Sequence, residues 1–187
     1  MVFDLPEIKE ANELMKTGDH QSATVLLERS LSICEMAMGQ QHADTFTLLH
    51  RLARAQLKGG KFASALASLR KMTEFTSETD TLPTVYHNLI LGLQTDPKTT
   101  SEALKYAEQW VKAAKSDEEK SLASLAVGHC QVLLKNNEAA KTTFKEAVDT
   151  ASSESPAKGI AQGFYARFLG LQPETRQEAI KHYSECI

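Results

Sequence analysis

The chain has few aromatic residues, few prolines and no long apolar run, and each shortage excludes a class of protein. Aromatic residues make up 6% of the 187 residues, while 42% are hydrophobic. Ala, Leu, Lys and Glu are frequent, and these residues favour helix over sheet. Only 5 residues are proline, so long stretches are free of helix breakers. This composition predicts an all-α fold.

The chain also has few cysteines and no stretch that would span a membrane. Cys34, Cys130 and Cys186 are odd in number and far apart, which does not resemble a disulfide framework. We therefore expect a reducing compartment and a cytoplasmic protein, although a removed import segment would leave the same sequence. Since no stretch approaches about 18 consecutive apolar residues, we expect no membrane span.

Neither a large charge of one sign nor a catalytic motif is present. The formal net charge is −3 and the pI is near 6.1, so we expect no nucleic acid partner. His129 beside Cys130, and His182 with Cys186, are the adjacent Cys and His pairs, and each lacks the further ligands that a metal site needs. We expect no enzyme activity, no metal and no cofactor.

What the chain does have is a helical pattern that recurs along its length. A small residue in the second helix of each unit is followed one turn later by a second residue, usually larger, which predicts close packing between neighbouring helices. The small residues are Ala23, Ala65, Ala103, Ala140 and Ala179, and the residues one turn later are Leu27, Leu69, Ala107, Phe144 and Tyr183. The pattern predicts a right-handed superhelical solenoid of about five antiparallel hairpins in one domain, 1–187. The expected hairpins span residues 5–39, 43–77, 82–115, 117–152 and 156–187.

Local signals mark some of the helix starts. Thr99 with Glu102, and Ser116 with Glu119, have the spacing of a capping box, in which two side chains satisfy backbone N–H groups at a helix start. Trp110 occurs at a position that faces the next hairpin, and we expect it to pack in the core.

These features resemble the tetratricopeptide repeat family, and the first half resembles the 42-residue repeats of kinesin light chains. The matching segments are Gly18-Asp19 followed by Ala23, the run from Leu31 to Gly39, His42-Ala43-Asp44-Thr45, Leu52-Ala53, and Gly60-Lys61-Phe62 followed by Ala65. The resemblance implies that the first helix of each hairpin lines a concave groove that binds a peptide or helical segment of a partner protein.

The resemblance also selects candidate binding residues. By analogy with groove positions of the family, the residue before the leucine of each first helix faces inward, which selects Arg51 and Asn88. Neighbouring candidates are Lys9, Asn12, Lys16, His50, Arg54, Lys58 and His87. Such a row of cations and amides suits a carboxylate or the backbone of an extended peptide. We therefore expect a non-enzymatic adaptor or scaffold.

An alternative is a structural subunit or assembly factor of a larger complex. In that case the chain docks through its outer face or through its C-terminal end, where Tyr183 to Ile187 lie in an amphipathic helix with no polar capping helix after it.

Overall fold

The computed structural model describes residues 5–75, 82–171 and 173–184, and these residues are helical with no strand. The expectation of an all-α fold built from about five helical pairs is confirmed. The α-helices are α1 (Pro6–Thr17), α2 (His20–Met38), α3 (Ala43–Lys58), α4 (Phe62–Thr73), α5 (Leu82–Gln94), α6 (Thr100–Ala113), α7 (Asp117–Leu133), α8 (Asn137–Thr150), α9 (Pro156–Gly170) and α10 (Arg176–Ser184), with a short 3₁₀ helix, η2 (Pro173–Thr175), before α10.

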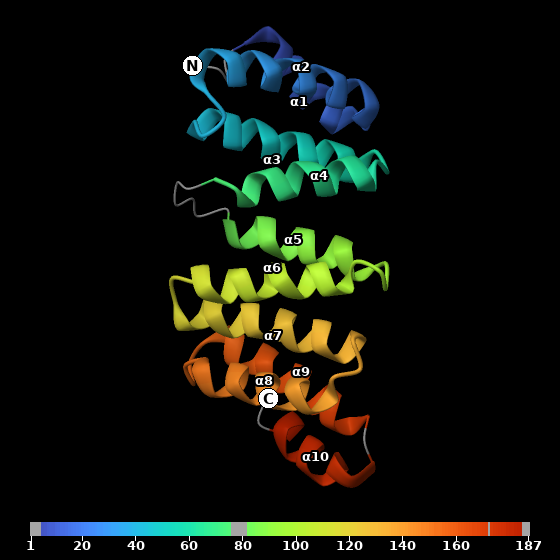
Figure 1. Ribbon diagram of the computed structural model, residues 1–187, viewed down its shortest axis with the longest axis vertical. Coiled ribbons are helices and arrows are strands. Elements are labelled where there is room, and N and C mark those ends of the chain that lie inside the picture. Colours follow the sequence, from blue (N-terminus) through green and yellow to red (C-terminus); the bar gives the residue numbers. More distant parts are fainter. Residues whose placement is uncertain (1–4, 76–81, 172, 185–187) are drawn as a thin grey trace. The chain divides into compact units, whose positions relative to one another are not determined.

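Two compact units divide the chain, Met1–Gly92 and Leu93–Ile187, and the boundary falls within α5. In the first unit α1 packs against α2, α2 against α3, and α3 against α4. In the second unit α6 packs against α7, α7 against α8, α8 against α9, and α9 against α10, and α7 also packs against α9 (Figure 1). Within each unit short turns join successive helices, so the consecutive pairs run antiparallel, whereas α7 and α9, with α8 between them, run parallel. The single domain over 1–187 stays a prediction.

Side-chain caps explain why several helices begin where they do. The Asp19 carboxylate accepts a hydrogen bond from the Ser22 backbone N–H at 3.0 Å, and this bond lowers the pKa of Asp19. Ser116 Oγ accepts from the Glu119 N–H at 3.1 Å, as the sequence predicts. The capping box predicted at Thr99 is wrong. The Thr99 hydroxyl instead donates to the Leu93 carbonyl at 2.6 Å, because the turn before α6 brings that carbonyl within reach.

The repeated small residue lies in the core of every hairpin. Ala23, Ala65, Ala103, Ala140 and Ala179 are at most 3% exposed. The residue one turn later is also buried in the first four hairpins. In the last hairpin, however, Tyr183 is 48% exposed, which overturns its expected place in the core. In the described part of the chain no further helix follows α10 to cover this side chain.

Trp110 lies in the core, as predicted, and its polar atom has a partner. The side chain is 5% exposed, and its Nε1–H donates to Glu119 Oε1 at 3.0 Å. Glu119 Oε2 accepts from the Lys115 backbone N–H, also at 3.0 Å. One carboxylate thus stabilises the start of α7 and satisfies the buried indole.

Candidate functional site

A groove lies between the first helices of the first two hairpins, α1 and α3. Its volume is about 900 Å³. Leu27 of α2, one turn after the buried Ala23, also lines it. The lining residues are Lys9, Glu10, Asn12, Glu13, Met15 and Lys16 of α1, Leu27 of α2, and Arg51, Arg54 and Lys58 of α3.

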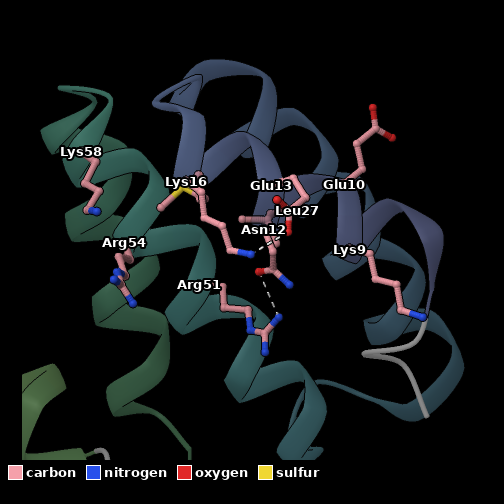
Figure 2. A pocket seen from close by; sticks show the side chains of 10 residues that line it. Lys9, Glu10, Asn12, Glu13, Lys16, Leu27, Arg51, Arg54 and Lys58 are labelled. Carbon is pink, nitrogen blue, oxygen red and sulfur yellow. Dashed lines mark hydrogen bonds and ion pairs between the residues drawn. The ribbon is translucent and has the colours of Figure 1, made fainter.

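Arg51 and Asn12 join the two walls of this groove. Arg51 Nη1 donates to Asn12 Oδ1 at 3.3 Å, across α3 and α1, and both side chains are partly buried. Figure 2 shows the Arg51 side chain extending from α3 toward Asn12. This hydrogen bond holds the guanidinium in a defined position between the two walls.

Cations outnumber carboxylates in the lining. Lys9, Lys16, Arg51, Arg54 and Lys58 face two acids, Glu10 and Glu13. Lys16 pairs with Glu13 at 2.7 Å, but both side chains are about 70% exposed, so that pair contributes little to stability. The remaining excess of positive charge makes the groove attractive to an anionic segment.

Six of the nine predicted binding residues line this groove, and three do not. His50 is half-buried on α3 outside the lining, where burial and the nearby Arg54 charge lower its pKa. His87 is exposed and Asn88 is half-buried, both on α5. The predicted residues that the groove does bring together are Lys9, Asn12, Lys16, Arg51, Arg54 and Lys58.

Two apolar residues of the groove were absent from the predicted set. Leu27 was recognised only as a packing residue, and Met15, one turn after Asn12 on α1, was not singled out. Met15 lies three residues after Asn12 on the same helix, and this spacing could have placed it on the same face as Asn12.

Two features of the described residues bear on catalysis, the placement of metal-ligating side chains and the state of the cysteine thiols. Among residues 5–75, 82–171 and 173–184, no three His, Cys, Asp or Glu side chains are placed to hold a metal ion. Cys34 and Cys130 are free and buried. Burial raises the pKa of the Cys130 thiol, which disfavours the reactive thiolate. None of the helices in the described residues is long and apolar enough to cross a membrane.

Comparisons with known proteins support the repeat assignment. The tetratricopeptide repeat model matches residues 11–77. No curated protein matches the sequence.

Solved structures are similar over almost the whole chain. Nearly identical repeats of a putative kinesin light chain from Podosopora anserina are 22% identical with a TM-score of 0.71, covering 96% of this chain and 91% of that one. BtubC from P. vanneervenii is 13% identical with a TM-score of 0.73, covering 94% and 75%. YrrB, described as a tetratricopeptide repeat protein with an unusual peptide-binding site, is 16% identical with a TM-score of 0.62, covering 98% and 84%.

These similarities agree with the helical hairpins and the buried alanines described above. Residues 11–77 match the tetratricopeptide repeat model, and the chain has the all-helical fold of tetratricopeptide repeat proteins.

Proposed function

We propose that the groove between α1 and α3 binds an acidic peptide segment of a partner protein, and that the protein is a non-enzymatic adaptor. The observation that carries this proposal is the excess of cations around Arg51, which is held across the groove by Asn12. Arginine presents several N–H donors in a planar fork that matches a carboxylate, so this arrangement selects an anion over a neutral peptide.

The volume of the groove supports a peptide ligand rather than a small ion. A volume of about 900 Å³ falls in the range of sites that enclose ligands much larger than a single carboxylate. Met15, which is half-buried, adds apolar surface beside the charges, and the buried Leu27 lies at the base of the lining. An extended segment with acidic residues would use both features, since its carboxylates reach the cations and its other side chains cover the apolar surface.

The test uses labelled hexaglutamate and hexaglutamine peptides with the full chain in fluorescence anisotropy. We expect hexaglutamate to bind more tightly, with an affinity that falls as salt is added. Arg51→Gln should weaken hexaglutamate binding by about tenfold. Lys61→Gln, which changes an exposed cation outside the groove, is the matched control and should leave binding unchanged. Equal binding of the two peptides, or equal losses in both variants, would refute the proposal.

A second candidate function, docking inside a larger complex through the outer face or the C-terminal end, is favoured by the last described helix. Ile180 and Tyr183 of α10 are 65% and 48% exposed. Such apolar side chains are typical of surfaces that meet another protein. If this surface docks, the isolated chain should associate in sedimentation velocity, and Ile180→Asp should reduce the association. A wild-type chain that stays monomeric and binds hexaglutamate would favour the adaptor instead.

A further inference from the structure

The second unit contains a groove that matches the first one position by position. In both α3 and α9 an exposed arginine lies between two pairs of buried residues, Arg54 in α3 and Arg167 in α9. On this register Phe164 occupies the position of Arg51, and Leu171 follows α9 where Lys58 ends α3. The buried pairs are Leu52–Ala53 and Ala55–Gln56 in α3, and Tyr165–Ala166 and Phe168–Leu169 in α9.

The opposite walls of the two grooves match as well. Asn12 precedes Ala23 by the same number of residues as His129 precedes Ala140, so α1 and α7 are in the same register. By this register Val132 corresponds to Met15, and Phe144 of α8 corresponds to Leu27 of α2. All three residues of the second unit, His129, Val132 and Phe144, line one hollow.

The chemistry of the second groove is different. Two hollows lie along α9, of about 150 Å³ and about 290 Å³, and Phe164 and Arg167 line both. Most other lining side chains are apolar, and no carboxylate is among them. The smaller hollow is lined by His129, Val132, Phe144, Phe164, Arg167, Phe168 and Leu171, and the larger by Gly159, Ile160, Gly163, Phe164 and Arg167.

Large apolar side chains of this groove remain open to water. Leu171 is 72% exposed, Ile160 is 45% exposed and Phe164 is 42% exposed. A cavity of about 150 Å³ with apolar walls accepts a group the size of a benzene ring. The smaller hollow therefore suits the side chain of Leu or Phe, and covering it would remove exposed apolar surface from water.

Arg167 supplies the charge of this groove. Within the described residues it has no ion pair. His129 stands opposite, and its ring is held by a 3.1 Å hydrogen bond between Nδ1 and Gln94 Oε1. Burial and the charge of Arg167 lower the pKa of His129, which favours the neutral imidazole. Arg167 is then the one formal charge in the lining of the two hollows.

We propose that the groove between α7 and α9 is a second peptide-binding site, and that it takes a segment with a Leu or Phe side chain next to an acidic residue. The apolar side chain enters the hollow beside Phe144 and Phe168, and the carboxylate pairs with Arg167. Charge complementarity selects the acid, and the size of the hollow selects the apolar anchor. This site does not depend on the groove between α1 and α3, which we propose to bind acidic segments without this anchor.

The experiment is a selection of phage-displayed random peptides on the full wild-type chain, repeated on single variants whose folding is checked by circular dichroism. We expect wild type to enrich peptides in which Leu or Phe stands beside Asp or Glu. Leu171→Gln should remove that class of peptide. Arg167→Gln should keep the apolar preference but weaken a selected peptide by about tenfold and remove the preference for an adjacent acid.

Arg54→Gln is the matched control, because it changes the equivalent arginine of the other groove. It should leave the apolar-plus-acidic class unchanged and reduce any purely acidic class. The second site is refuted if no apolar-plus-acidic class is enriched, if Leu171→Gln and Arg167→Gln leave that class unchanged, or if Arg54→Gln removes it. Loss of the purely acidic class alone would bear only on the first groove.

Discussion

In residues 1–92 the groove between the first helices is lined mainly by charged side chains, whereas the equivalent groove of residues 93–187 is lined mainly by apolar ones. Arg51 and Lys58 are replaced by Phe164 and Leu171 on matching positions. Buried positions must fit the neighbouring helix, but groove positions contact only water or a ligand. A repeat can therefore keep its fold while its binding chemistry changes.

The core residues beneath the two grooves differ as well. There, two residues on facing helices change together. Phe144 of the second unit replaces Leu27 of the first, and Gly128 replaces Ala11. A Cβ atom built on Gly128 would lie 2.7 Å from Phe144 Cε1, closer than any stable contact. The larger Phe144 ring therefore requires a glycine at position 128 on the facing helix. Close packing is kept in both units, but by different pairs of residues.

The largest expected effect is a charge placed in the repeated alanine position of either unit. Ala65→Asp in the first unit and Ala140→Asp in the second should each lower the free energy of unfolding by about 3 kcal/mol or more, since both positions are fully buried and a carboxylate placed there loses its hydration. Thermal unfolding followed by circular dichroism measures this. Ala63→Asp, at an exposed position in the first turn of α4, is the control and should unfold like wild type. Wild-type curves for Ala65→Asp and Ala140→Asp would refute the repeat register.

The next effect tests the exchange of core residues between the units. Gly128→Ala should destabilise the chain by about 1 to 3 kcal/mol, because the new methyl group meets the Phe144 ring. Phe144→Leu, which restores the pair found in the first unit, should recover much of that loss in the double variant. Denaturant unfolding of the wild type, both single variants and the double variant gives the coupling energy. Additive losses would show that the two positions are independent.

A smaller effect on stability is expected at two turns that share a hydrogen-bond pattern but differ in their left-handed residue. Lys61 N–H donates to the Gln56 carbonyl at 2.8 Å, and Asn136 N–H donates to the Gln131 carbonyl at 2.8 Å. The residue before each donor is left-handed, Gly60 with φ 74° and Lys135 with φ 62°. Lys135→Gly should stabilise the chain by up to about 1 kcal/mol, since glycine adopts this backbone without a steric penalty. Gly60→Lys should destabilise it by a similar amount. The midpoint of thermal unfolding reports both changes, and shifts of equal sign would contradict the comparison.

The smallest effect is the response to acid. Burial, and then the nearby charge of Arg54, lower the pKa of His50 below its ordinary value of about 6.5. The unfolded chain therefore binds more protons than the folded one below about pH 6.5, so stability is full above that pH and falls as the pH drops toward the folded pKa. His50→Gln should lose less stability than wild type between about pH 7.5 and about pH 5.5. Identical losses, measured as unfolding midpoints, would exclude His50 from the acid response.

Short-range features of the fold could be predicted from the sequence because they depend on spacing along one helix. The small residues at Ala23, Ala65 and Ala140 recur with a helix period, so their burial follows from the pattern alone. Thr99 could not be predicted in the same way. Its hydroxyl could cap the start of α6 or donate to the Leu93 carbonyl. Which bond forms depends on the path of the turn.

The same distinction between spacing along one helix and tertiary structure applies to the candidate grooves. Residues of α1 and α3 could be selected singly by repeat position, which identified Lys9, Asn12 and Arg51. The apolar groove of the second unit was not identified, because Phe164 and Leu171 look like ordinary core residues in a helical pattern. Only their exposure in the structure distinguishes them from the buried Phe168 and Leu169.

The sequence by itself determined the helices, most of their starts and ends, and the register of small residues that brings each helix close to the next. These depend on capping groups, glycine turns and periodicity, which act over one or two turns of the chain. Only the tertiary structure decided which side chains face one another across a groove, such as Arg51 and Asn12, and which apolar residues stay uncovered, such as Leu171. Those outcomes depend on helices that are distant in sequence and close in space.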